Sequence, residues 1–144
     1  MSDSEFNLFQ WLHDAAEREP DPSRLVWEDT RMRWSLIEQQ ARRLAGGLSK
    51  IGVREGDRVA VMLPNIPPFL VAEFASLLLG SIVVPVHVNT RSEELGYLLD
   101  DSEAKVLISW SGYRDVIDDA LQQTESLRHR IEIDAGEGAL DFAA

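Results

Sequence analysis

The side chains that could act in metal binding or acid–base catalysis are scattered along the chain. Its three histidines, His13, His87 and His129, are far apart in sequence and fall on three different predicted elements. A zinc or iron site needs at least three converging nitrogen, oxygen or sulfur ligands, and the 144 residues contain no cysteine. A lone histidine in a strand, such as His87, is more often a hydrogen-bonded structural residue than a catalyst. The pattern therefore predicts no metal site.

Acidic residues occur as adjacent pairs, and this spacing does not suit a general acid and base. The pairs are Glu93-Glu94, Asp100-Asp101 and Asp118-Asp119. Neighbouring helical residues do not share a face, so the two carboxylates of a pair point in different directions. We interpret all three pairs as solvated surface groups.

No motif that binds phosphate or activates a nucleophile is present. The patterns G-x-G-x-x-G, G-x-x-x-x-G-K-[ST] and G-x-S-x-G do not occur. The only lysines, Lys50 and Lys105, stand outside any glycine-rich loop, and four of the 12 arginines are directly beside acidic residues: Arg18, Arg54, Arg58 and Arg114. The sequence thus predicts no catalytic residue, no cofactor-binding residue and no bound cofactor within this chain.

Three short apolar runs, rich in β-branched residues, form the predicted framework: 58–63, 82–88 and 105–110. They alternate with helix-length segments, a pattern typical of a parallel sheet connected by right-handed crossovers. The runs show little polar alternation, which favours strands covered on both faces. We expect an α/β fold of layered helices and a mostly parallel sheet, with an almost wholly apolar helix over 69–79 buried against it.

Asn65 lies at the end of the first predicted strand, a position that invites an active-site interpretation. Pro67 and Pro68 follow, in what would be the first turn of the apolar helix, where a missing N–H is harmless. We expect the Asn65 side chain to cap this helix, so that its replacement by alanine would cost about 1 kcal/mol of stability. Contact with a ligand is the alternative.

The segments before this framework read as a helix over 5–18, a hairpin over 25–34 and a second helix that ends at Gly52. Gly46-Gly47 inside the second helix costs about 1 kcal/mol per glycine relative to alanine. We therefore expect close packing against a neighbour at that point.

The segments after the framework carry a weaker pattern. A surface helix is predicted over 111–127 and a short strand over 131–134, and residues 135–144 read as a loop or frayed tail. The organised part of the chain is thus predicted to be 1–134.

The stretch 53–110 also carries a family resemblance. GDRVAVMLPN, a buried helix, a VVPV strand and then R-x-E-E-L-x-Y-L-L-x-D-S-E-A-K-V-L resemble the N-terminal part of the adenylate-forming synthetases, most of all the fatty acyl-CoA synthetases. NLFQWL at 7–12 and ARRLAGGL at 41–48 agree with it, so that the resemblance covers 5–134. One departure is Arg-Trp-Ser-Leu at 33–36, where the family usually has Thr-Tyr before an acidic residue and leucine.

The resemblance implies a two-step reaction of a longer parent enzyme. A carboxylate attacks the α-phosphate of ATP to give an acyl-adenylate and pyrophosphate, and the thiol of coenzyme A then displaces AMP. ATP, Mg²⁺ and coenzyme A are the implied cofactors, and phosphate-binding N–H groups, a cation and Mg²⁺ are needed. The family's Ser/Thr-Gly-Thr-Thr-Gly-x-Pro-Lys-Gly loop and its C-terminal lysine are absent here.

We therefore expect residues 1–134 to be the N-terminal subdomain of an acyl-CoA ligase-like AMP-binding domain, inactive by itself. Its partners would be the remainder of the parent enzyme and, through it, a carboxylic (fatty) acid.

The alternative is a free-standing, non-catalytic α/β module that binds a partner or a small ligand. An open reading frame that continues past Ala144 into a phosphate loop would favour the ligase. The sequence identifies neither the acid nor the acceptor, which is coenzyme A or a carrier-protein thiol.

The composition limits the classes of partner that this chain can bind. The net charge is −11 and the pI about 4.6, which opposes nucleic acids and anionic membranes because both require a basic patch. No apolar run reaches the about 18 residues of a membrane span, and acidic residues occupy the start of the chain, where a signal peptide is basic. We expect a cytoplasmic protein.

Apolar surface that the missing residues would cover predicts self-association as a homo-oligomer.

Overall fold

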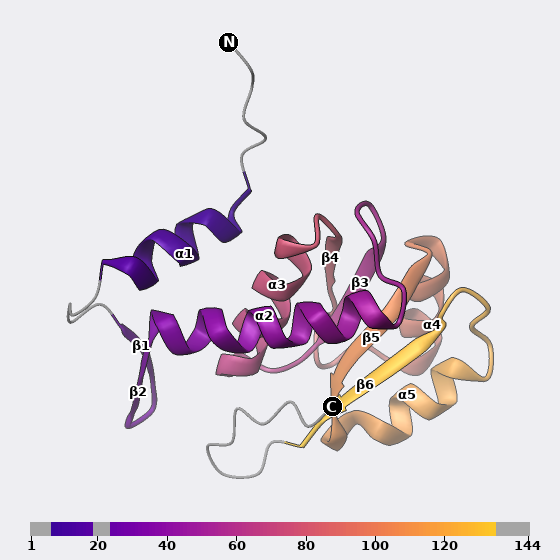
Figure 1. Cartoon of the computed structure of the whole chain (residues 1–144). Helices are drawn as coiled ribbons and strands as arrows, with labels where there is room; N and C mark the ends of the chain where they lie inside the picture. Colours follow the sequence, from indigo (N-terminus) through magenta and orange to yellow (C-terminus); the bar gives the residue numbers. More distant parts are fainter. Residues whose placement is uncertain (1–6, 19–23, 135–144) are drawn as a thin grey trace.

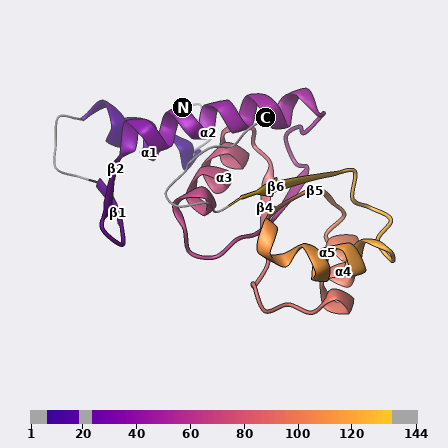
Figure 2. The same cartoon turned by 90° about the horizontal axis from the view of Figure 1, so that it is seen from below.

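A parallel sheet with helices on both faces is the centre of the fold (Figures 1 and 2). The structure is a computed structural model that describes residues 7–18 and 24–134. Its elements are, in chain order, α1 (Phe9–Glu17), β1 (Arg24–Trp27), β2 (Thr30–Arg33), α2 (Trp34–Lys50), β3 (Arg58–Met62), α3 (Pro67–Leu78), β4 (Ile82–Pro85), α4 (Ser92–Asp101), β5 (Ala104–Trp110), the 3₁₀ turn η1 (Ser111–Tyr113), α5 (Arg114–Leu121) and β6 (His129–Ile133).

The four strands of the sheet run in the order β4-β3-β5-β6, and every neighbouring pair is parallel. Val59 of β3 lies opposite Val83 of β4 and Val106 of β5. The predicted parallel arrangement of the three apolar runs is confirmed. β4 is shorter than the predicted 82–88, because the chain turns after Val86 and Thr90 N–H donates to the carbonyl of His87.

Alternate residues of the central strands point to opposite faces of the sheet. Val59 and Val61 pack with α2 and α3, whereas Ala60 and Met62 pack with α4 and α5. Figure 2 shows the two helix pairs on opposite sides of the sheet. Burial on both faces explains why these strands are almost continuously apolar.

The N-terminal segment covers the outer side of α2 and α3. α1 packs against α2 through its buried Phe9 and Leu12. Asn7 ties the start of α1 to α3, because its side-chain amide donates to the carbonyl of Leu77 at 2.8 Å. The predicted hairpin is confirmed as the antiparallel pair β1 and β2, which leads directly into α2 (Figure 1).

Two expectations about helices are wrong. Gly46 and Gly47 lie on the exposed side of α2, and a Cβ added at either would meet no heavy atom of the described residues within 4 Å. Close packing therefore does not explain them. The surface helix expected over 111–127 is only the 3₁₀ turn η1 followed by α5, which ends at Leu121. Residues 135–144, the expected loop or tail, lie outside the described residues.

Candidate functional site

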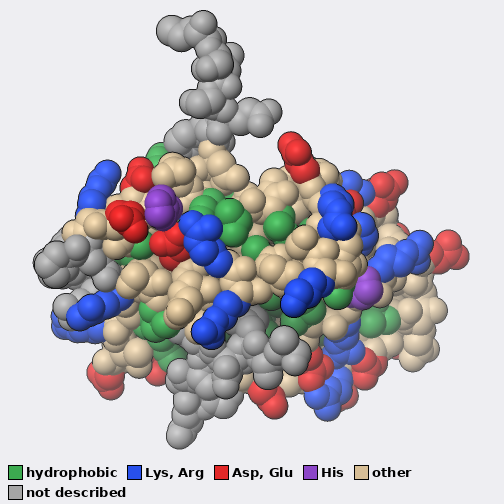
Figure 3. All heavy atoms as spheres, in the orientation of Figure 1, with side chains coloured by type: hydrophobic (Ala, Val, Ile, Leu, Met, Phe, Trp, Pro, Cys, Tyr) green, Lys and Arg blue, Asp and Glu red, His purple; other side chains and the backbone are tan. Residues whose placement is uncertain are grey.

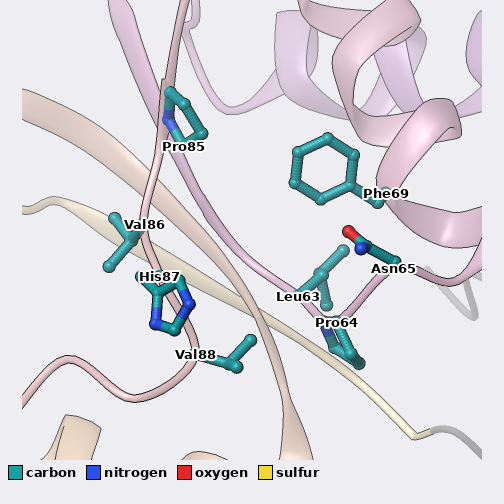
Figure 4. Close-up of a pocket in the computed structure, with 8 residues that line it drawn as sticks. All are labelled: Leu63, Pro64, Asn65, Phe69, Pro85, Val86, His87 and Val88. Carbon is teal, nitrogen blue, oxygen red and sulfur yellow. The ribbon is translucent and has the colours of Figure 1, made fainter.

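A hollow of about 460 Å³ opens at the carboxyl ends of β3 and β4, next to the start of α3 (Figure 4). Ligands of open parallel sheets bind outside the carboxyl ends of the strands. The hollow is therefore the candidate site of this chain. It is lined by Leu63, Pro64, Asn65, Phe69, Pro85, Val86, His87 and Val88.

Asn65 does not cap the helix, so the predicted role is wrong. The N-cap position of α3 is Ile66, and no side chain caps it. Pro67 and Pro68 occupy the first helical positions and have no N–H, and Phe69 N–H already donates to the carbonyl of Ile66 at 2.9 Å. Few backbone N–H groups in the first turn of α3 therefore remain as donors to a capping side chain. The exposed Asn65 amide makes no hydrogen bond with the residues that the structure describes, and Figure 4 shows it directed towards the hollow.

His87 stands across the hollow from Asn65 (Figure 4). Its Nδ1 accepts a hydrogen bond from the backbone N–H of Asn89 at 3.2 Å. In the neutral imidazole, an accepting Nδ1 leaves the proton on Nε2. Nε2–H is then free to donate to a ligand.

The rest of the wall is apolar. Phe69 and Pro85 close one end of the hollow, and Pro64 and Val88 close the other (Figure 4). A second hollow of about 260 Å³ lies between the β1–β2 hairpin and the start of α3, and it shares Asn65 and Phe69 with the first. Its remaining lining residues are Leu25, Val26, Trp27, Ile66, Pro67 and Leu70.

Two cations of the sheet, Lys105 and Arg58, are used at the opposite, amino-terminal ends of the strands, and a further one, Arg130 of β6, pairs with Asp118 and Glu132. Lys105 Nζ donates to the carbonyl of Gly52 at 2.7 Å and to Asp57 Oδ2 at 3.0 Å. Arg58 donates from Nε to the carbonyl of Ser102 at 2.6 Å. No Lys, Arg, Asp or Glu lines either hollow in the described part of the chain. The site thus offers hydrogen bonds and apolar surface but no charge.

The three histidines are not brought together. His13 Nδ1 lies 2.9 Å from Glu38 Oε1 and joins α1 to α2, and Arg42 donates to the same oxygen. His129 begins β6. Within residues 7–18 and 24–134, no group of three His, Asp or Glu side chains is arranged to hold a metal ion.

The acidic pairs have structural roles that their spacing does not disclose. The Asp100 carboxylate accepts the backbone N–H groups of Glu125 and Ser126, each at 3.0 Å, and its interactions with Ser126 and Glu125 lower the pKa of Asp100. Asp118 forms an ion pair with Arg130. Both carboxylates lie at the surface, as predicted, but each also makes a tertiary contact that the sequence does not reveal.

Comparison with known proteins identifies the class to which this fold belongs. Residues 12–142 match the family model described as AMP-binding enzyme. The chain therefore belongs to the AMP-binding enzyme family, and its α/β fold is that of the N-terminal subdomain of adenylate-forming ligases.

Three relatives show the range of the match. The chain is 32% identical over 148 residues to the long-chain-fatty-acid–CoA ligase of Thermus thermophilus, covering 99% of this chain and 27% of that protein. It is 42% identical over 93 residues to triostin synthetase I of Streptomyces triostinicus, covering 65% of this chain and 18% of that protein. The N-terminal domain of FACL13 from Mycobacterium tuberculosis has a similar structure, with a TM-score of 0.79, 27% identity and coverage of 88% of this chain and 33% of that chain.

The chain thus spans between 18% and 27% of the length of these curated relatives. No helix in the described part of the chain is both long and apolar enough to cross a membrane.

Sequence reasoning missed the facing pair of Asn65 and His87. The available signal was that both residues follow the ends of adjacent parallel strands.

Proposed function

We propose that this chain is the N-terminal subdomain of an ATP-dependent, AMP-forming acyl-CoA ligase that activates a carboxylic acid, such as a fatty acid. The observation that carries the proposal is the match of almost the whole chain to the long-chain-fatty-acid–CoA ligase of Thermus thermophilus. The likeness in fold to the N-terminal domain of FACL13 supports it independently of sequence motifs.

In this proposal the chain contributes the scaffold, and the phosphate chemistry belongs to other parts of the parent enzyme. The candidate site does not fit a triphosphate, because no cation lines it in the described part of the chain and the prolines remove two N–H groups at the start of α3. We therefore assign no residue of this chain to ATP, Mg²⁺ or coenzyme A. By itself the chain is expected to be inactive, and we place the parent enzyme in the cytoplasm.

We propose two alternative acceptors for the acyl group, coenzyme A and a carrier-protein thiol. Most of the relatives are named as CoA ligases, which favours coenzyme A. The high identity to triostin synthetase I, whose name contains no CoA ligase, keeps a carrier-protein thiol as the second acceptor.

A free-standing binding module is the second candidate function. One observation favours it: Asn65 and His87 face each other across a hollow that this chain forms without help from any other segment. Such a module would bind a small ligand and catalyse nothing.

Expression of the complete open reading frame separates the two functions. The product is incubated with ATP, Mg²⁺, coenzyme A and a series of acids of increasing chain length, and acyl-CoA is measured by mass spectrometry. The ligase proposal predicts acyl-CoA that depends on all four components. A reading frame that stops after Ala144, or a longer product that forms neither acyl-adenylate nor acyl-CoA with any acid, would overturn it in favour of the module.

A further inference from the structure

The hollow at the carboxyl ends of β3 and β4 has an unused set of hydrogen-bonding groups. The Asn65 amide offers two N–H donors and one carbonyl acceptor, and it makes no hydrogen bond with the described residues. His87 offers Nε2–H as a single donor, since its Nδ1 accepts from Asn89. Figure 4 shows these two side chains on opposite sides of the same space. A ligand between them meets donors from both sides and an acceptor from one.

The surroundings disfavour an anion. Neither hollow is lined by Lys or Arg in the described part of the chain. The start of α3, which would otherwise attract negative charge, lacks the N–H groups of Pro67 and Pro68. The net charge of −11 repels anions at long range. A carboxylate or phosphate would lose hydration here without gaining a countercharge.

Apolar surface lies next to the hydrogen-bonding groups. Phe69 borders both hollows, so an apolar chain that leaves the first hollow can continue along its ring into the second. There Trp27 and Leu70 supply further apolar surface. The ligand that fits has a polar, uncharged group at one end and an apolar chain at the other.

We propose that the hollow binds an uncharged carboxamide that carries an alkyl or aryl chain. The ligand carbonyl accepts from His87 Nε2–H, its N–H donates to the Asn65 carbonyl, and its chain packs on Phe69 towards the β1–β2 hairpin. This site goes beyond the proposed ligase function, because it requires neither ATP nor coenzyme A.

The test uses the whole ¹⁵N-labelled chain at pH 7.5 and three probes: hexanamide, hexanoate and inorganic pyrophosphate. Each probe is titrated while two-dimensional NMR spectra record the Asn65 side-chain NH₂, the His87 ring and the backbone around Phe69. Hexanamide is expected to shift these signals saturably. Hexanoate is expected to bind about two- to tenfold more weakly, because the Asn65 carbonyl then faces a carboxylate without a donor. Pyrophosphate is expected to cause no saturable shift.

Variants locate the binding. Asn65→Leu and His87→Leu each remove one hydrogen-bonding partner and are expected to weaken hexanamide about two- to tenfold. Asn89→Ala is the matched control, because it retains the backbone N–H that holds His87 while changing a neighbouring side chain, and it is expected to bind like the unmodified chain. Thermal unfolding of each variant verifies that it folds.

Three results would overturn the site: no saturable shift with hexanamide, equal or tighter binding of hexanoate or pyrophosphate, or unchanged affinity in folded Asn65→Leu and His87→Leu variants. None of these results bears on acyl-CoA formation by the complete reading frame. Failure of this inference and failure of the ligase proposal are therefore distinguishable.

Discussion

At the scale of single residues, the ion pair of Lys105 and Asp57 links the turn before β3 to the start of β5. The hydrogen bond from Lys105 and a second from the backbone N–H of Arg54 lower the pKa of Asp57. A carboxylate whose folded-state pKa is lowered stabilises the fold fully above its unfolded pKa of about 4, and this contribution disappears as pH falls through the folded-state pKa. Both side chains are about one-third exposed, so the contribution is modest.

The first prediction concerns the pH dependence of stability. Asp57→Asn should lower the free energy of unfolding by about 0.5–1 kcal/mol at pH 7, and the difference from the unmodified chain should begin to shrink below about pH 4 and disappear as pH falls through the lower folded-state pKa. Urea unfolding between pH 3 and 7 measures both curves, and Asp119→Asn, at an exposed position of α5, is the control. Parallel curves at all pH values would show that the pair with Lys105 does not operate.

The second prediction concerns Asn65. Because no side chain caps α3, Asn65→Ala should change the free energy of unfolding by less than about 0.5 kcal/mol. Urea unfolding of the variant at pH 7 measures it. A loss of about 1 kcal/mol would restore the capping role expected from sequence.

Single residues were the least predictable part of the structure. The sequence places Asn65 before a helix, but whether its amide caps that helix depends on N–H groups that the two following prolines remove. Asp100 receives its hydrogen bonds from Glu125 and Ser126, which lie far along the chain. Such contacts follow from the tertiary fold and leave no local pattern.

At the scale of elements, α2 carries an unexplained weakness. Gly46 and Gly47 lie within its exposed surface with open space around them. Glycine in a helix interior is about 1 kcal/mol less favourable than alanine.

The third prediction is that Gly46→Ala and Gly47→Ala each raise the free energy of unfolding by about 0.5–1 kcal/mol, as measured by chemical denaturation. Gly52→Ala is the contrasting variant. Its φ of +94° is disfavoured for alanine, and this variant should destabilise the chain. Destabilisation by Gly46→Ala would mean that a neighbour contacts α2 at this point.

Elements were well predicted where burial dictates their composition. The strands β3 and β5 are covered on both faces, so consecutive residues in them are apolar and the strands can be recognised in the sequence. The pairing of β6 with β5 depends on residues that are farther apart in the sequence. The two hollows do not arise from any single stretch of the sequence. They join the hairpin, the β3–α3 turn and the end of β4, which are distant in sequence.

At the scale of the whole molecule, apolar side chains remain on the surface. Figure 3 shows charges of both signs interspersed over the face that carries α1 and α2, with apolar side chains visible between them. The outer edge of β4, which no other strand of the described residues covers, is a second such region, because Ile82 is 52% exposed there. Unpaired edges and apolar patches promote association between copies.

The fourth prediction is that the chain forms dimers or larger species at moderate concentration. Sedimentation velocity over a wide concentration range measures this, and Ile82→Lys should shift the distribution towards monomer, because a charged residue on an edge strand opposes pairing. A monomer at every concentration would contradict the prediction and favour the free-standing module.

The cations on the strands of the sheet are paired away from the candidate site, and this separation underlies the proposed function. Lys105 and Arg58 are held at the amino-terminal edge, while the carboxyl-terminal hollow is uncharged. A member of the AMP-binding enzyme family therefore presents here a scaffold whose candidate site does not suit phosphate.

Titration of Mg-ATP into the purified 144-residue chain, followed by an assay for acid-dependent release of pyrophosphate, tests whether this chain contains a phosphate site. We expect no measurable heat of binding and no pyrophosphate with any fatty acid, since triphosphate binding requires converging N–H donors and cations. Micromolar affinity for ATP, or any acid-dependent release of pyrophosphate, would contradict it and would place a phosphate site within this chain.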